Sequence, residues 1–335
     1  MASSVPKTMK AVILEQNGGP DELHYKTDYP TPAPGQDEVL VKNEVIGINY
    51  IDTYFRTGLY PLPSKPAIIG QEASGTISAV GPGSKSHRFE VGDRVVWMKF
   101  GSYAEYSAVS AEKTIKIPDG ISNEDAVGGF LMGMTALSLV KEAYPVQKGD
   151  WVMLHAAAGG VGLLMCQLLR AIGAKTIATA GGAEKCELAR KHGADHVIDY
   201  RSTGAPKWLD EVKRLTNDEG VAVVYDSVGK DTWENSLEAA RRKGKVVFYG
   251  NASGPVPPFP IARLSAKNIS VIRPTLMGYT YTREEFEYYA NELFQLVKSG
   301  DLRIRIHDTY KLENAAQAHR DLEARKTTGK LLLKP

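Results

Sequence analysis

Cysteine is almost absent from this sequence, since the 335 residues include only Cys166 and Cys186. Two cysteines cannot form the disulfide framework that stabilises small secreted domains, and their scarcity is typical of a reducing compartment. They also cannot supply the clustered thiolates of a structural zinc site. The sequence therefore predicts a protein with neither a disulfide framework nor structural zinc.

Net charge and long apolar runs are lacking as well. A formal net charge of +2 gives no strong attraction to nucleic acid or to an anionic membrane. Residues 1–10 lack the apolar core of a signal peptide. One uncharged and largely apolar stretch, residues 126–140, has 15 residues interrupted by three glycines and is too short to cross a bilayer. We expect this stretch to form a buried helix and the protein to be cytoplasmic, with no membrane as a partner and no sign of a nucleic-acid partner in its charge.

The residues that are present follow two different patterns. From residue 9 to 118, short apolar runs alternate with turns rich in glycine and proline, which is typical of a largely β domain. After residue 151, strand-like and helix-like segments alternate, which predicts a doubly wound α/β fold with a parallel sheet. The expected strands are 152–155, 176–180, 196–199, 221–226 and 245–249, and the expected helices are 160–172, 183–192, 206–216 and 232–241.

The end of the chain changes character again. Residues 283–299 and 313–325 have the pattern of amphipathic helices, and residues 329–333 have the pattern of a strand. They follow the natural end of a six-stranded sheet. We therefore expect this tail to return to the first domain.

The segment from Trp151 to Arg170 places a glycine-rich turn between a strand and an apolar helix. A dinucleotide site requires that order. Gly159 would let the backbone approach a pyrophosphate, Gly162 would let the helix pack closely on the strand, and the amides at the helix start would bind the anion. Ala157 replaces the first glycine of the G-x-G-x-x-G motif. Glycines also serve ordinary turns, but the flanking strand and helix favour a nucleotide site.

The end of the second strand indicates which dinucleotide binds. NAD sites place an acidic residue about 20 residues further on, where it binds the ribose 2′-hydroxyl. Here Gly181 and Gly182 occupy that position, Lys185 follows, and Tyr200 and Arg201 end the neighbouring strand. A missing carboxylate and an available cation suit the 2′-phosphate of NADPH. The alternative is that Lys185 is simply a solvated helix residue.

Three other segments, residues 47–60, 70–75 and 223–229, carry a family resemblance together with this turn, as does the ending 322–330. On these motifs the sequence resembles the zinc-free quinone oxidoreductase (zeta-crystallin-like) branch of the medium-chain dehydrogenase/reductase superfamily. The likeness covers residues 10–335.

The resemblance implies two domains with the active site in the cleft between them. The catalytic GroES-like β domain would comprise residues 1–125 and 277–335. The NADPH-binding Rossmann domain would comprise residues 126–276.

Zinc-dependent members of the superfamily carry a metal-binding cysteine where this chain has residues 49–52. They also carry Gly-His-Glu where it has Gly70-Gln71-Glu72. The amide of Gln71 is a poor zinc ligand, and neither Cys166 nor Cys186 lies at a ligand position. We therefore expect no catalytic zinc.

The resemblance implies catalytic roles for Asn49, Asp52 and Tyr54, and cofactor contacts for Asn49 and Tyr54 as well. The other implied cofactor contacts are Thr135, Gly159, Gly160, Val161, Gly181, Lys185, Tyr200, Ser227, Tyr249, Gly250, Asn251, Pro274, Thr275, Leu276 and Arg325. Two alternatives stay open: Tyr54 only packs, and Asp52 caps a helix or pairs with Arg56. Met132 stands where many relatives carry a polar residue.

The implied reaction is hydride transfer from NADPH to a quinone. An electron-poor acceptor suits a site without a metal to polarise an alcohol. Reduction of α,β-unsaturated aldehydes or ketones is the alternative with the same fold and cofactor. The zeta-crystallin branch also includes lens-structural and RNA-binding proteins, but the sequence has no arginine-rich run and no RNP-type motif to support RNA binding.

Residues 268–273 have the pattern of the last strand of the parallel sheet. An unpaired edge strand invites pairing with its twin across a two-fold axis, so we expect a homodimer. The alternative is a short edge protected by Arg273 and Pro274.

Overall fold

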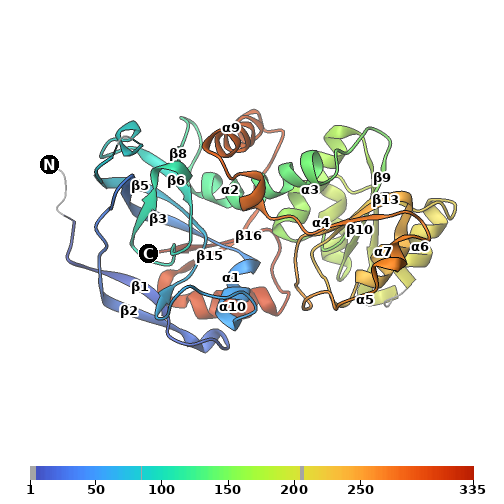
Figure 1. Cartoon of the computed structure of the whole chain (residues 1–335), viewed down its shortest axis with the longest axis horizontal. Coiled ribbons are helices and arrows are strands. Elements are labelled where there is room, and N and C mark those ends of the chain that lie inside the picture. The colour runs from blue at the N-terminus through green and yellow to red at the C-terminus, as the bar shows by residue number, and fades with distance from the viewer. Residues whose placement is uncertain (1–4, 84, 204–206) are drawn as a thin grey trace. The chain divides into compact units, whose positions relative to one another are not determined.

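A computed structural model of the chain describes residues 5–83, 85–203 and 207–335 (Figure 1). Residues 1–4 of the expected first domain and Pro206 of the expected helix 206–216 lie outside the described residues. The chain divides into two compact units. The first contains the residues up to Leu131 together with Thr282–Pro335, and the second is Met132–Tyr281. These divisions fall a few residues after the expected boundaries at 125/126 and 276/277.

The first unit is built on two mainly antiparallel sheets. The larger sheet has seven strands in the order β15-β16-β3-β5-β6-β8, with β7 paired to β3. Its strands are β3 (Glu38–Ile48), β5 (Glu72–Val80), β6 (Arg94–Met98), β7 (Tyr106–Ser110), β8 (Thr114–Lys116), β15 (Ile306–Lys311) and β16 (Lys330–Lys334). The smaller sheet orders β2 (Leu23–Pro30), β1 (Thr8–Leu14) and β4 (Ala67–Ile68). Apolar strand residues such as Val39, Val41 and Ile46 are fully buried and form the core.

One helix of the first unit was not predicted from the sequence. Helix α1 (Tyr50–Thr57) follows β3 directly, and Asp52 caps its start by accepting a hydrogen bond from the backbone amide of Asn49 at 2.8 Å. Gly58 ends the helix in the left-handed conformation, with φ 84°. The sequence does carry local signals for this helix, the capping pair Asn49 and Asp52 and the terminal Gly58, but the segment has only 8 residues and lies between strand-like runs.

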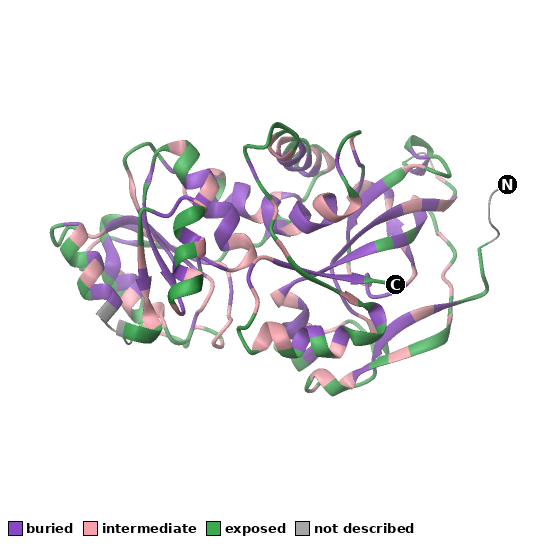
Figure 2. Ribbon diagram, turned by 180° about the vertical axis from the view of Figure 1, so that it is seen from behind, coloured by how far each residue is buried: buried purple, intermediate pink, exposed green. Residues whose placement is uncertain are grey.

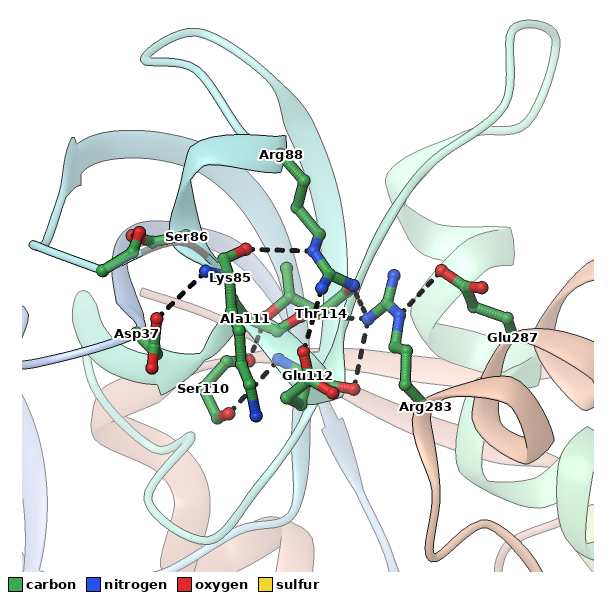
Figure 3. A network of polar contacts seen from close by, with 11 residues as sticks. Asp37, Lys85, Ser86, Arg88, Ser110, Ala111, Glu112, Thr114, Arg283 and Glu287 are labelled. Carbon is green, nitrogen blue, oxygen red and sulfur yellow. Dashed lines mark hydrogen bonds and ion pairs between the residues drawn. The ribbon is translucent and has the colours of Figure 1, made fainter.

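The tail belongs to the first unit. Helix α9 (Arg283–Ser299) has the predicted bounds, and helix α10 (Ala315–Glu323) and strand β16 lie within two residues of them. Strand β16 pairs with β3, with Leu331 opposite Ile48. Arg283 fixes the start of α9, because its side chain reaches the backbone around β8 (Figure 3). Its guanidinium donates to the carbonyl oxygens of Ala111, Glu112 and Thr114 at 2.9, 3.1 and 2.7 Å and pairs with Glu287 at 2.7 Å.

Helix α2 (Asn123–Ser138) continues into a π-helical turn, Leu139–Ala143. Among the described residues it is the one helix long and apolar enough to cross a membrane, but most of it is buried inside the fold. A Cβ added to Gly129 would lie 2.8 Å from Ile304 Cδ1, so this glycine lets the helix approach its neighbour closely. The expectation of a buried helix is confirmed.

The second unit is a six-stranded parallel sheet in the order β11-β10-β9-β12-β13-β14. Numbered along the chain, this is the order 3-2-1-4-5-6 of dinucleotide-binding folds. Its elements are β9 (Trp151–Leu154), α3 (Gly160–Ile172), β10 (Lys175–Ala180), α4 (Ala183–Lys191), β11 (His196–Asp199), α5 (Tyr200–Thr203), α6 (Lys207–Leu215), β12 (Val221–Asp226), α7 (Trp233–Ala239), β13 (Ala240–Phe248), β14 (Ser270–Ile272) and α8 (Leu276–Tyr279). The sheet strands are mostly buried, and the exposed residues of this unit gather on its helices and loops (Figure 2). The predicted doubly wound α/β fold is confirmed.

The expected helix 232–241 is too long at its end. Ala240 is extended, with ψ 135°, and β13 begins there. The first residues of β13 extend the pairing with β12, since Ala240 lies opposite Val221. Strand pairing therefore overrides the helical pattern at the last two residues of the prediction.

Candidate functional site

The turn between β9 and α3 is closed by contacts with backbone atoms. Ala156 has a positive φ of 53°, and Gly159 caps α3 in an extended conformation. A Cβ on Gly162 would lie 2.5 Å from the carbonyl oxygen of Ala156 and 2.7 Å from the Cα of Ala157. Because such backbone atoms cannot move aside cheaply, glycine is required at position 162. The predicted residues Gly159, Gly160 and Val161 thus form the start of α3, where amides and helix dipole favour an anion.

The ends of β10 and β11 bring Gly181, Tyr200 and Arg201 together. A Cβ on Gly181 would lie 2.5 Å from the hydroxyl oxygen of Tyr200 and 3.0 Å from Nε of Arg201. The nearby carboxylate of Asp199 accepts the backbone amides of Gly182 and Arg201 at 2.8 and 2.9 Å, and these bonds lower its pKa. Asp199 therefore holds the turn, while the guanidinium of Arg201 lies beside the position where NAD sites carry an acid.

The turns that follow β12 and β13 lie in contact. Asp226 accepts the amides of Val228 and Gly229 at 2.8 and 3.0 Å and so shapes the turn that contains Ser227. A Cβ on Gly250 would lie 2.6 Å from the carbonyl oxygen of Ser227. Tyr249 and Asn251 flank this glycine, so the four predicted residues share one edge of the sheet.

Other predicted cofactor residues of the second unit lie on its helices and on the segment after β14. Lys185 lies in the first turn of α4, and Thr135 lies on α2. Pro274, Thr275 and Leu276 follow β14, and the Thr275 side chain caps α8 by accepting from the Gly278 amide. The carboxyl ends of neighbouring parallel strands meet at one edge, which is where open α/β sheets bind ligands.

The remaining predicted residues, Asn49, Asp52, Tyr54 and Arg325, belong to the first unit. Arg325 is exposed and follows α10 with a positive φ of 56°. Tyr54 lies on α1 and is only 8% exposed. Its ring makes edge-to-face contacts with Tyr50 and Tyr60, with centroids 5.6 and 5.2 Å apart. Packing therefore accounts for the ring of Tyr54, whatever its hydroxyl does.

Asn49 is held by buried charged side chains. Its Nδ2 donates to Oε1 of Glu72 at 2.8 Å, and its Oδ1 accepts from Nζ of Lys330 at 2.7 Å. Lys330 and Glu72 also form an ion pair in which both side chains are fully buried. The other oxygen of Glu72 accepts the backbone amide of Leu131 at 2.8 Å. Every formal charge in this cluster thus has a partner, as buried charges require.

Asp52 lies beneath Asn49 and is fully buried. Its Oδ2 accepts the Asn49 amide and the Tyr103 hydroxyl, the latter at 2.9 Å, and its Oδ1 has no partner among the described residues. Burial raises the pKa of Asp52 to about 7, although both hydrogen bonds and the charge of Lys330 oppose the rise. Of the two alternatives for Asp52, the capping contact is present, whereas Arg56 pairs with Glu323.

A chain of hydrogen bonds continues from Asp52 to the surface. The Tyr103 hydroxyl meets Nε2 of His319 at 3.0 Å, and Arg56 donates to Nδ1 of His319 at 3.3 Å and to Glu323. Because a guanidinium only donates, Nδ1 accepts and Nε2 carries the proton. Burial and the charge of Arg56 lower the pKa of His319 to about 3, so the ring is neutral. Each hydrogen bond therefore has one direction: Nε2 of His319 donates to the Tyr103 hydroxyl, and this hydroxyl donates to Asp52.

Glu72, Lys330, Tyr103 and His319 were not predicted as site residues. Glu72 and Lys330 lie inside two segments that carry the family resemblance, but Glu and Lys are almost always exposed, so their burial was not expected. One available signal was that Lys330 opens the run Leu331-Leu332-Leu333, a pattern of a buried strand. Tyr103 and His319 lie far apart in the sequence, and only the fold brings them into contact.

Gln71, which stands where zinc-dependent relatives carry histidine, is buried, and its Nε2 has no partner among the described residues. Within the described ranges, no group of three or more His, Cys, Asp and Glu side chains is arranged to hold a metal ion. The residues at this position therefore do not fit a catalytic zinc.

Comparisons with known proteins agree with both units. Residues 35–119 match the alcohol dehydrogenase GroES-like domain, and residues 160–295 match the zinc-binding dehydrogenase family. A quinone oxidoreductase of Pseudomonas aeruginosa is 45% identical over 329 residues, covering 97% of this chain and 99% of the relative. A 2-haloacrylate reductase of a Burkholderia species is 36% identical over 334 residues, covering 97% and 98%. The structure of Escherichia coli quinone oxidoreductase complexed with NADPH superposes with a TM-score of 0.93 at 41% identity, covering 97% of this chain and all of that one (100%).

A GroES-like unit and a six-stranded Rossmann-like unit together define a medium-chain dehydrogenase/reductase. Within that superfamily, the chain belongs to the quinone oxidoreductase family. The family resemblance and the fold class predicted from the sequence are both confirmed.

Proposed function

We propose that this protein is a zinc-independent NADPH:quinone oxidoreductase. The observation that carries the proposal is the edge of the parallel sheet, where Arg201 and Tyr200 lie over Gly181 and the Asp199 carboxylate is engaged by backbone amides. This arrangement supplies a cation where NAD sites supply an acid. The relatives named quinone oxidoreductase, and the E. coli structure with bound NADPH, support the same reading.

In this proposal the second unit is the NADPH-binding domain. Gly159, Gly160 and Val161 bind the pyrophosphate through the amides of α3. Gly181, Lys185 and Tyr200, together with Arg201, surround the 2′-phosphate. The remaining contacts come from Thr135, Ser227, Tyr249, Gly250, Asn251, Pro274, Thr275 and Leu276, and from Asn49, Tyr54 and Arg325 of the first unit.

NADPH, when bound, supplies the hydride. Asn49 and Tyr54 donate hydrogen bonds to the quinone oxygen on which negative charge develops, as an oxyanion hole does. Asp52 acts as a positioning residue, because it is buried and caps the helix that begins beside Asn49. No cysteine serves as a nucleophile: both are buried, and burial raises the pKa of Cys166 to about 12.

The test is a turnover screen in which NADPH and NADH are each combined with quinones and enones, and NADP+ and NAD+ are each combined with alcohols. We expect turnover of quinones with NADPH, and Tyr54→Phe should lower kcat/KM about tenfold by removing a hydrogen bond made in the transition state. Alcohol oxidation without quinone reduction would contradict the proposal. An unchanged kcat/KM in Tyr54→Phe would leave packing as the role of Tyr54.

A second candidate is reduction of a carbon–carbon double bond conjugated to a carbonyl or carboxylate group. It is favoured by the 36% identity to a 2-haloacrylate reductase along the whole chain. The same screen separates the two, because an enone reductase would show a higher kcat/KM for enones than for quinones.

We also propose a cytoplasmic homodimer. Strand β14 forms the end of the parallel sheet and pairs only with β13 among the described strands, which leaves an edge for a second copy. The shortness of β14 and the bond from Arg273 to the Pro274 carbonyl at 3.3 Å favour the protected-edge alternative. Sedimentation at micromolar concentration should give twice the mass of one chain, and a single-chain mass would overturn the dimer.

A further inference from the structure

Strand register brings Asn49, Glu72 and Lys330 together from three distant parts of the sequence. In the antiparallel pairs, Gly47 lies opposite Glu72 and Ile48 lies opposite Leu331. Asn49 therefore follows the last residue of β3 and lies beside the first residues of β5 and β16. Glu72 and Lys330 belong to strands of the sheet in the first unit, and Asn49 links β3 directly to α1.

Gly47 provides the space that the Glu72 side chain needs. A Cβ at this position would lie 2.5 Å from Oε1 of Glu72 and 2.8 Å from its Cγ. The carboxylate thus folds over the glycine and reaches the amide of Asn49. The glycine is needed for the room it leaves rather than for a special backbone angle.

The chemistry of the two partners fixes the Asn49 amide in one orientation. An ammonium only donates and a carboxylate only accepts, so Oδ1 must face Lys330 and Nδ2 must face Glu72. Nδ2 carries two hydrogens, and one is used by Glu72. The bond from the Lys330 ammonium also withdraws charge from the amide oxygen, which strengthens the remaining N–H as a donor.

We propose that Lys330 is a positioning residue for quinone reduction, which holds the Asn49 amide so that its second N–H donates to the substrate oxygen. This inference rests on the proposed function, in which Asn49 stabilises charge on the quinone. A purely structural ion pair would have no reason to include the amide. Here both charged partners bond to it, and the Asp52 carboxylate fixes the adjoining backbone.

The test is a double-mutant cycle on kcat/KM for a quinone at saturating NADPH. K330M/E72Q removes the ion pair without leaving a buried charge, and it is made alone and combined with Asn49→Leu. If Lys330 acts through Asn49, the pair substitution should lower kcat/KM about tenfold in the parent and less than about twofold when combined with Asn49→Leu. Lys334→Met, the same change on the exposed end of β16, is the control and should stay within about twofold of the parent.

Equal losses with and without Asn49→Leu would overturn the role, because a structural defect multiplies with any other change. No effect of Asn49→Leu by itself would overturn it as well. If K330M/E72Q does not fold, Gly47→Ala replaces it, since the added Cβ must displace Glu72 from Asn49. A parent without NADPH-dependent quinone turnover would reject the proposed function and this inference with it, whereas an active parent with multiplying losses rejects only Lys330.

Discussion

The candidate sites of the two units are held in shape by different kinds of contact. In the second unit, the turns at 156–162 and 181–182 are shaped by glycines, whose missing Cβ atoms leave room for backbone and ring atoms. In the first unit, Asn49 is held by the charged side chains of Asp52, Glu72 and Lys330, all of them buried. The first kind of site fails when an atom is added, and the second fails when a partner is removed. The two kinds of damage can be measured separately.

The largest effect should follow the loss of one buried charge. Lys330→Met leaves the carboxylate of Glu72 buried without its cation, so we expect the free energy of unfolding to fall by about 3–5 kcal/mol. Lys334→Met removes an exposed partner of Glu124 and should cost less than about 1 kcal/mol. Urea unfolding of both variants measures the difference. Equal, small losses would show that buried charge does not stabilise this cluster.

An added methyl group should damage the second unit next most strongly. The Cβ of Gly162→Ala would lie 2.5 Å from a backbone oxygen, and such overpacking costs about 1–3 kcal/mol of stability. Displacement of the amides at the start of α3 should raise the Kd for NADPH at least about tenfold. Gly19→Ala is the matched control, since a Cβ there meets no atom within 4 Å. Fluorescence titration with NADPH checks both, and unchanged binding in Gly162→Ala would contradict the assigned site.

Removing a cation should change cofactor choice more than stability. A hydrogen bond to a charged group contributes about 1.5–3 kcal/mol, so Arg201→Ala should weaken NADPH binding about tenfold and leave NADH binding unchanged. Lys185→Ala should have a smaller effect, because Arg201 remains beside Gly181. We expect the double variant to lose the preference for NADPH. Equal Kd values for the two cofactors in the parent would reject this reading.

The last effect concerns pH. Burial raises the pKa of Asp52 from 3.8 to about 7, so the folded protein binds more protons at this group than the unfolded chain between those values. Its contribution to stability therefore falls as the pH rises from about 4 to 7, by at most about 1.4 kcal/mol per pH unit. The pKa of His319 is lowered to about 3, so its effect has the opposite sign. Its contribution to the free energy of unfolding decreases as the pH falls below about 6.5.

Asp52→Asn should remove one of these opposing contributions. The unfolding free energy of the parent minus that of the variant should decrease from pH 4.5 to pH 7, as measured by urea unfolding at several pH values. A difference that stays constant with pH would show that Asp52 does not titrate in this window.

The contrast between the units also explains what the sequence could predict. The turn at 156–162, the strands of the parallel sheet and the helix 283–299 rest on local patterns, so their positions agree with the structure to within a few residues. A site formed by backbone amides can be predicted from its glycines, because they occur at fixed spacings between a strand and a helix. Arg201 could also be placed from a local pattern, because it lies two residues after the end of the expected strand 196–199.

Only part of the Asn49 cluster could be predicted from the sequence. Asn49 and Asp52 were named through the family resemblance, but Glu72, Tyr103, His319 and Lys330 come from segments that approach only after the sheet has formed. Each of these side chains is common on protein surfaces, and no spacing relates them. Helix α1 was missed for a different reason: it carries local capping signals, but its 8 residues lie within a region whose other segments are strand-like.

The pairing of strand β16 with β3 determines when the sheet of the first unit can be completed during synthesis. Synthesis on the ribosome delivers β3 early and β16 among the last segments, yet the two strands pair directly, with Leu331 opposite Ile48. Met132–Tyr281 is contiguous and emerges in between, so the Rossmann-like unit can complete its sheet while the earlier unit still lacks a strand. The ammonium that holds Asn49 arrives with that strand. The first unit is therefore completed after the second, and a nascent chain can form its Rossmann-like sheet before Lys330 is in place to hold Asn49.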